Sequence, residues 1–299
     1  MPPRSLHLVL TYRCDRECDH CFVWGSPRQT GSMTIASVRH LLRQAKRVES
    51  IEWVYFEGGE PFLHYPLLVE AVAEARAMGF RVGVVSNGFW ARDKRRAMAR
   101  LAPLAGLVDD LSISSDSFHC PSGTCPGPAS ARSAAEELEI PSIALSVHPL
   151  TDTVRGAGGN GGYPVLYRGR AAEKLAERCS LRPWSDFDSC VNEDLVDPGR
   201  VHVDPFGNMY VCQGICLGNL FRISLKGLLD SCSLETSPVI GPLVSGGPAE
   251  LVRAYELSHE QAYADSCHLC YVARRSLRSR FPGILTPDQA YGVVRLSTG

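Results

Sequence analysis

Three cysteines near the N-terminus have the spacing of metal ligands. Cys14, Cys18 and Cys21 stand in the segment CDRECDHC, directly after the apolar run from Leu6 to Leu10. Three thiolates on one short loop can bind three irons of a cubane cluster. Because a fourth cysteine is missing from the segment, one iron would stay open to a ligand from outside the protein, as catalytic metal sites keep a free position.

A zinc loop is the alternative for this segment, with His20 as the fourth ligand. His20 is the immediate neighbour of Cys21 in the sequence. Its ring would be strained in reaching the same ion, so the spacing favours an iron–sulfur cluster over zinc.

A second group of cysteines lies in the C-terminal part of the chain. Its members are Cys190, Cys212, Cys267 and Cys270, and the last two form a C-x2-C pair. Four thiolates complete a site without an open position, which suits a structural or electron-transfer cluster. A zinc ribbon uses the same ligands, and Cys216 offers a further candidate in the loop of Cys212.

The elements that must position the first group alternate between strands and helices. Apolar and amphipathic periods predict about six β-α units between Arg4 and Glu177. They indicate an α/β fold with a partial (β/α)6 TIM-like barrel, in which the carboxyl ends of the strands meet on one face. The expected strands cover 6–10, 51–56, 80–85, 107–114, 142–147 and 163–167, and the expected helices cover 34–48, 67–78, 92–101, 129–138 and 171–177.

Beyond Pro183 the periodicity weakens and cysteines become more frequent. A hairpin is expected there, with strands 200–203 and 209–212 around a turn at 204–208. We therefore predict two domains, a barrel core over 1–183 and a small cysteine-rich domain over 184–299.

The first cysteine motif, C-x3-C-x2-C after the first strand of a β/α barrel, resembles the signature of radical S-adenosylmethionine (SAM) enzymes. The segment from Phe56 to Pro61, FEGGEP, is similar to the GGEP segment of that family. The resemblance implies that Gly58, Gly59 and Glu60 bind the amino end of SAM. Glycines permit close backbone approach, and a carboxylate pairs with an ammonium group.

Two further segments carry the resemblance at later strand ends. Ser86-Asn87-Gly88 is similar to the family's TNG segment, and SISSD, residues 112–116, is similar to its strand that contacts the SAM ribose. The implied SAM-binding side chains are Ser86, Asn87, Ser114 and Asp116.

The second cysteine group looks like the twitch extension, a shortened relative of the SPASM domain. The resemblance implies one auxiliary [4Fe–4S] cluster on Cys190, Cys212, Cys267 and Cys270. Cys212 is preferred to Cys216 because of its distance from Gly207.

The resemblance also implies the chemistry. The reduced first cluster would cleave SAM to a 5′-deoxyadenosyl radical, which would abstract hydrogen from a small polar substrate, with oxidation of a sugar or cyclitol as the first hypothesis. A peptide-modifying SPASM-type maturase, a radical epimerase and a non-catalytic iron–sulfur or zinc protein are the alternatives. Cys120 and Cys125 follow the fourth expected strand and are either hydrogen donors to a substrate radical or ordinary loop residues.

Charge and hydropathy bound the partners. The formal net charge is −1, from 31 basic and 32 acidic residues, so no overall field favours nucleic acid or an anionic membrane. The basic segment 274–280 is interpreted as a solvated helix face. No signal peptide or membrane span is apparent, so a cytoplasmic location is expected, with a small-molecule substrate and a reducing partner such as flavodoxin or ferredoxin.

Overall fold

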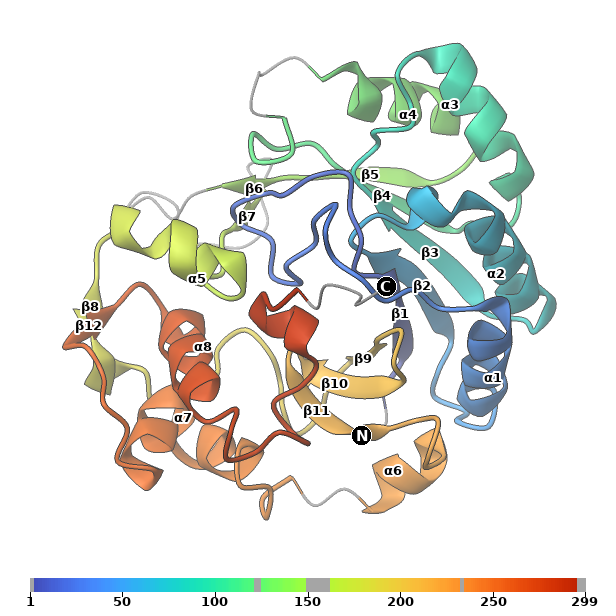
Figure 1. Cartoon of the computed structure of the whole chain (residues 1–299). Coiled ribbons are helices and arrows are strands. Elements are labelled where there is room, and N and C mark those ends of the chain that lie inside the picture. Colours follow the sequence, from blue (N-terminus) through green and yellow to red (C-terminus); the bar gives the residue numbers. More distant parts are fainter. Residues whose placement is uncertain (1–2, 121–124, 149–161, 232–233, 295–299) are drawn as a thin grey trace.

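One eight-stranded sheet connects the N-terminal and C-terminal parts of the chain. The computed structural model describes residues 3–120, 125–148, 162–231 and 234–294 (Figure 1). The order of the strands in this sheet is β11-β10-β9-β1-β2-β3-β4-β5. The strands are β1 (Ser5–Thr11), β2 (Trp53–Gly58), β3 (Arg81–Ser86), β4 (Asp110–Ser114), β5 (Ser142–Leu145), β9 (Arg200–Val203), β10 (Asn208–Cys212) and β11 (Ile215–Asn219).

The first five strands run parallel and alternate with helices that cover one face of the sheet (Figure 1). Along β2, Val54 and Phe56 are fully buried, whereas Tyr55 and Glu57 on the opposite face are only partly buried. This alternation follows from the two-residue period of a strand. The helices between these strands are α1 (Ile35–Ala45), α2 (Tyr65–Ala77), α3 (Lys94–Leu101) and α4 (Pro126–Glu137).

Local sequence fixes where these helices begin. The Thr34 hydroxyl accepts a hydrogen bond from the Ser37 amide at the start of α1, as expected for an N-cap. Asp93 caps α3 in the same way through the Arg96 amide. The predicted α/β fold with a mostly parallel sheet is confirmed.

The sixth unit differs from the expectation. The residues predicted as its strand contribute only β7 (Tyr163–Pro164), which pairs with β6 (Val147–His148) in a separate small sheet. Pro164 has no amide hydrogen, so it cannot continue a ladder of hydrogen bonds. The place beside β1 in the main sheet is taken by β9 from the C-terminal part of the chain.

The predicted hairpin is present and belongs to the main sheet. β9 is antiparallel to β10, and β10 is antiparallel to β11. Because β9 also pairs in parallel with β1, the main sheet contains strands from both sides of the domain boundary predicted near residue 183. The division into two domains stays a prediction.

The remaining elements lie in the C-terminal part of the chain (Figure 1). α8 begins after Asp265, whose carboxylate accepts a hydrogen bond from the His268 amide, and it carries Cys267 and Cys270. None of the helices in the described ranges is long and apolar enough to cross a membrane. These elements are α5 (Arg170–Lys174), β8 (Arg182–Pro183), α6 (Leu225–Ser231), α7 (Ile240–Ala254), β12 (Ala262–Tyr263) and α8 (Ser266–Ser276).

The interpretation of the basic segment as a solvated face is wrong for Arg274. This side chain is 2% exposed, and its Nη1 donates a hydrogen bond to the Gln213 carbonyl oxygen at 2.8 Å. Arg275 instead pairs with Glu173 on α5. One turn of α8 thus directs one arginine into the protein and its neighbour outward.

Core packing on β2 gives a first prediction. Phe56→Ala should lower the free energy of unfolding by about 3–5 kcal/mol, because it removes a fully buried ring. Ile143→Ala on β5, where the side chain is half exposed, should change it by only about 0.5 kcal/mol or less. Denaturant unfolding followed by circular dichroism measures both, and equal midpoints for the two variants would contradict this account of the core.

Candidate functional site

The first cysteine loop lies between β1 and α1, at the carboxyl end of the parallel strands. Cys14 is buried, Cys18 and Cys21 are half buried, and all three are free thiols. The Gly25 amide donates to Cys21 Sγ at 3.2 Å, and the Arg16 amide donates to Cys14 Sγ at 3.4 Å. Hydrogen bonds of this kind support sulfur atoms that carry negative charge as metal ligands.

Burial makes Cys14 and Cys18 poor thiolates without a metal. It raises the pKa of Cys18 to about 12, with a further contribution from Cys21, and it raises the pKa of Cys14 well above the ordinary range. A bound cation reverses this balance, because a coordinating thiol is deprotonated. These free thiols therefore fit a cationic iron–sulfur group.

The spacing of the sulfur atoms argues against zinc. A tetrahedral zinc ion with bonds of about 2.3 Å would hold its sulfurs about 3.8 Å apart. Among the described residues, the groups of three or more ligand atoms within 4.8 Å of one another contain no cysteine. A cubane binds each thiolate to a different iron and spreads the sulfurs further apart.

His20 does not join the cysteines. It belongs to a group with Asp116 and His119, and its ring lies 4.8 Å from the His119 ring. Burial lowers the pKa of His20 to about 4, so the ring is neutral at pH 7. In this arrangement His20 is not placed to act as the fourth ligand of a zinc ion bound by the three cysteines.

Arg170 holds the cysteine loop from a distant part of the chain. Its side chain is 3% exposed, and it donates to the carbonyl oxygens of Cys18 at 2.7 Å and Gly25 at 2.8 Å. The Arg170 amide also donates to the Cys21 carbonyl oxygen. No local sequence pattern links the start of α5 to this loop, so the role of Arg170 could not be predicted from the sequence.

Glu60 connects the ends of β2 and β3 through its hydrogen bonds. Its Oε1 accepts hydrogen bonds from the Phe62 amide and the Ser86 hydroxyl, and its Oε2 accepts one from the Asn87 amide. Burial raises the pKa of Glu60 to about 7, although these hydrogen bonds oppose the shift. Three protein donors thus already occupy the carboxylate that the resemblance assigns to SAM.

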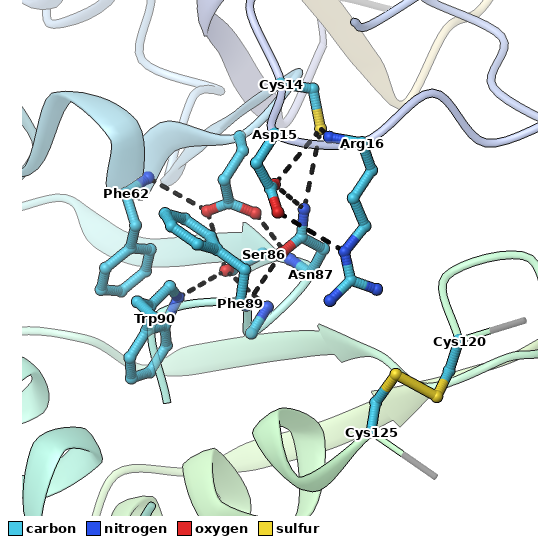
Figure 2. Close-up of polar contacts among 12 residues, drawn as sticks. Cys14, Asp15, Arg16, Phe62, Ser86, Asn87, Phe89, Trp90, Cys120 and Cys125 are labelled. Atoms are coloured by element: carbon cyan, nitrogen blue, oxygen red, sulfur yellow. Dashed lines mark hydrogen bonds and ion pairs between the residues drawn. A yellow bond between two sulfur atoms is a disulfide. The ribbon is translucent and has the colours of Figure 1, made fainter. Parts of the chain in front are cut away.

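Asn87 links this network to the cluster loop. Its Nδ2 donates to Asp15 Oδ1 at 2.8 Å and lies 3.6 Å from Cys14 Sγ (Figure 2). Ser86 accepts a hydrogen bond from the indole of Trp90 at 2.9 Å. Both residues therefore lie beside the first cysteine group, where they also hold the polypeptide in place.

The two glycines before Glu60 are required by the packing of β2 against β1. A Cβ atom on Gly58 would lie 2.3 Å from the Thr11 carbonyl oxygen, and one on Gly59 would lie 2.2 Å from the Arg13 carbonyl oxygen. Gly58 also has a φ of +148°, which favours glycine. These residues let the end of β2 approach the start of the cysteine loop.

Asp116 is buried after the end of β4. Its Oδ1 accepts hydrogen bonds from the His119 amide and, at 2.9 Å, from His119 Nδ1, while its Oδ2 accepts one from the Val147 amide. Ser114, two residues earlier, is half buried at the end of the same strand. Both lie at or just beyond the carboxyl end of β4, where the sequence predicted them.

The structure brings the second cysteine group together. Electrostatic interactions connect Cys212 with each of Cys190, Cys267 and Cys270, and all four are free thiols. Cys216 is buried on β11, where its Sγ lies 3.3 Å from the Gly218 carbonyl oxygen. The preference for Cys212 over Cys216 agrees with this arrangement.

Buried polar side chains that the sequence did not reveal surround this group. Arg168 Nη1 lies 3.7 Å from Cys212 Sγ, and Asn192 Nδ2 lies 3.3 Å from Cys267 Sγ. Burial works to lower the pKa of Arg168, but Cys212, Cys267 and Glu193 outweigh it and raise that pKa. Arg274 adds a second buried guanidinium beside the group, so the site fits an anionic thiolate cluster.

Cys120 and Cys125 form a disulfide with a Cα–Cα distance of 5.7 Å (Figure 2). A sulfur atom in a disulfide carries no S–H hydrogen. Hydrogen donation by either residue would therefore require prior reduction, and this role stays a prediction.

A cavity of about 650 Å³ lies against the face of the sheet opposite the helices α1 to α4, which we call the inner face. Both acidic and basic side chains line it, and Asn192 and Glu193 extend from it toward the second cysteine group. The polar side chains of its wall are Ser5, His7, Tyr55, Ser112, Tyr163, Asn192, Glu193, Asp194 and Arg200.

A comparison with protein families matches residues 8–120 to the radical SAM superfamily. Residues 8–120 of this chain therefore form a radical SAM domain. Members of the superfamily bind SAM and a [4Fe–4S] cluster, and the matched range contains Cys14, Cys18, Cys21 and the segment around Glu60.

Two curated relatives are similar to parts of this chain. It is 31% identical over 119 residues to the putative peptide biosynthesis protein YydG of Bacillus subtilis strain 168, which covers 40% of this chain and 37% of that protein. It is 37% identical over 90 residues to the PqqA peptide cyclase of Xanthomonas campestris pv. campestris strain B100, which covers 29% of this chain and 23% of that protein. The matches thus span well under half the length of these relatives.

A solved structure shows the same fold over nearly the whole chain. This is the native anSMEcpe with bound AdoMet, with a TM-score of 0.50, 15% identity, and coverage of 94% of this chain and 97% of that one. At this identity the likeness concerns the fold alone.

The contacts of Arg170 give the second prediction. Arg170→Gln should weaken iron retention at the first site by about 10- to 100-fold, because the carbonyl groups of Cys18 and Gly25 lose their buried donor. Iron and sulfide per chain after anaerobic reconstitution and desalting measure the effect. Arg275→Gln on the surface is the control, and equal iron retention in the two variants would contradict this role.

Proposed function

We propose that this chain reductively cleaves SAM and abstracts a hydrogen atom from a small polar substrate. The observation that carries the proposal is the set of three free thiols, one buried and two half buried, with no fourth cysteine beside them in the loop. When bound there, a [4Fe–4S] cluster supplies an iron that chelates SAM and an electron that cleaves it to methionine and a 5′-deoxyadenosyl radical. Cys14, Cys18 and Cys21 would hold that cluster.

The residues around the thiols orient them and keep water away. The amides of Arg16 and Gly25 donate to sulfur, and Arg170 fixes the loop from behind. Exclusion of water protects reactive intermediates from side reactions. Gly58, Gly59, Glu60, Ser86, Asn87, Ser114 and Asp116 are proposed to form the SAM-binding surface, with Glu60 acting through the position of the Asn87 backbone.

The cavity on the inner face of the sheet supports a small polar substrate. Its volume of about 650 Å³ is within the range of small-molecule sites, and its wall offers His7, Glu193 and Arg200 as hydrogen-bonding and charged groups. Such a wall suits a polyhydroxylated molecule such as a sugar or cyclitol. Oxidation of a carbinol to a ketone is the reaction we propose: the 5′-deoxyadenosyl radical would take the hydrogen atom on carbon, the hydroxyl group would release its proton to water, and the auxiliary cluster would accept the remaining electron.

The second cysteine group would hold an auxiliary [4Fe–4S] cluster. Its four thiols and the nearby guanidinium groups of Arg168 and Arg274 favour a cluster over zinc. Among the described residues, no three of its sulfur atoms all lie within 4.8 Å of one another, as a tetrahedral zinc site would require. A cluster at this position supplies one-electron redox chemistry. Asn192 lies between it and the cavity, since it lines the cavity and donates to Cys267 Sγ.

Peptide modification is the second candidate function. The names of two relatives, a putative peptide biosynthesis protein and a peptide cyclase, favour it. The two matches cover 40% and 29% of this chain, so the names of these relatives alone do not decide the substrate of the whole chain. A small reducing protein such as flavodoxin or ferredoxin, in the cytoplasm, is the electron donor that we propose.

The third prediction concerns SAM cleavage. The reconstituted protein with SAM and dithionite should form 5′-deoxyadenosine, and Cys14→Ala should lower the rate at least about 1,000-fold, because the open-iron cluster is lost. Chromatography of the anaerobic reaction measures the product. Cys179→Ala, which lies outside both cysteine groups, is the matched control.

A substrate screen in the same assay separates the two candidate functions. Cyclitols and amino sugars should accelerate 5′-deoxyadenosine formation, whereas acceleration only by peptides would favour the second candidate. An absence of SAM cleavage in protein with intact clusters would refute both and favour a non-catalytic iron–sulfur protein.

The fourth prediction concerns the number of clusters. Anaerobically reconstituted protein should contain about eight irons per chain, and Cys267→Ala should contain about four, because the second site would lose its cluster. Metal and sulfide analysis with Mössbauer spectroscopy gives both counts. Four irons with one zinc ion per chain would contradict the auxiliary cluster and leave the first site unaffected.

A further inference from the structure

Two histidines and one glutamate converge on the inner face of the sheet, away from both cysteine groups. His7 is on β1, Glu57 on β2 and His202 on β9, and these three strands are neighbours in the order β9-β1-β2. His7 is in register with His202 on one side and with Tyr55 on the other. Glu57 lies two residues beyond Tyr55, so the period of the strand returns its side chain to the same face.

The ligand-type atoms of these residues form a tight group. Glu57 Oε2 lies 3.2 Å from His7 Nδ1, and Glu57 Oε1 lies 3.3 Å from His202 Nε2. All three donor atoms lie within 4.8 Å of one another. The side chains of His7, Glu57 and His202 are 14%, 16% and 12% exposed, so the group is largely screened from bulk water.

These separations are those expected between ligands of one metal ion, and the 3.2 Å contact between His7 and Glu57 also lies at the long end of the range of ordinary N–H···O hydrogen bonds. A hydrogen bond between a charged imidazole and a carboxylate is typically about 2.7–2.9 Å long. Bonds of about 2.1 Å from a metal to nitrogen and oxygen place neighbouring ligand atoms about 3.0–3.4 Å apart at octahedral or tetrahedral angles. Both observed contacts, 3.2 and 3.3 Å, lie in the second range.

The residue types agree with this geometry. Two histidines and one carboxylate with open positions form a common site for divalent first-row transition metals. The competing explanation is that these three side chains are held together by hydrogen bonds alone. The environment of His202 Nδ1 does not distinguish a metal site from such a hydrogen-bonded group. This atom is buried without a partner in the described part of the chain, and it lacks one under either explanation.

We propose that His7, Glu57 and His202 bind one divalent first-row transition-metal ion at the wall of the inner cavity. His7 lines that cavity, so the positions that the protein leaves open are available to water or to an oxygen atom of a molecule in it. A hydroxyl or carboxylate group is the chemical class that such an ion takes. The site shares no ligand with the cysteine groups, and the inference does not depend on SAM cleavage.

Manganese binding to the cluster-loaded protein tests the site. Mn²⁺ is the probe because it prefers nitrogen and oxygen ligands and discriminates against thiolates. With the clusters oxidised, titrated Mn²⁺ should lose its free-ion electron paramagnetic resonance signal up to one ion per chain. His7→Asn and His202→Asn should each weaken binding on the order of 100-fold, because each removes one of three ligands.

His259→Asn is the matched control, because the half-buried His259 packs against the Trp184 ring and hydrogen-bonds to a backbone carbonyl group, and it is not one of the three proposed ligands. Its Mn²⁺ affinity should equal that of the unaltered protein. Iron content and circular dichroism verify that each variant keeps its clusters and fold. The proposal is overturned if the unaltered protein binds no Mn²⁺, or if the double variant His7→Asn/His202→Asn binds it equally well.

Discussion

The parallel pairing of β1 with β2 on one side and β9 on the other is the constraint on which the sites depend. β1 leads directly into the cysteine loop, β2 ends at Gly58, and β9 turns back into the strand that carries Cys212. One set of backbone hydrogen bonds therefore fixes the first cysteine group, the segment around Glu60 and one ligand of the second group. Because side chains alternate across a strand, the same register places His7, Glu57 and His202 together on the inner face.

Close backbone contact between β1 and β2 requires residues without side chains. A Cβ on Gly58 or Gly59 would overlap the carbonyl oxygens of Thr11 or Arg13. The same approach allows the Glu60 amide to donate to the Arg13 carbonyl oxygen, next to Cys14. These glycines resemble a cofactor-binding motif. They also have a structural role, because they allow the end of β2 to pack closely against the cysteine loop.

Two arginines near the start of α5 contact the two cysteine groups. Arg170 binds carbonyl groups of the first cysteine loop, and Arg168, two residues earlier, lies beside Cys212 of the second group. One short segment at the start of α5 therefore contacts both sites. A buried guanidinium is unfavourable unless it is paired, and here thiols, carbonyl groups and Glu193 provide the partners. The two cysteine groups are therefore connected by one short segment of the chain.

The sequence by itself determined the α/β fold class, the first cysteine motif and the cap at Thr34, because these depend on residues close together in the chain. It also selected the four cysteines that the fold brings together. Only the tertiary structure decided that β9 takes the place beside β1, that Arg274 points inward, and that Glu57 lies between His7 and His202. Those outcomes depend on strand pairing across about 200 residues of sequence, for which no local period or motif carries a signal.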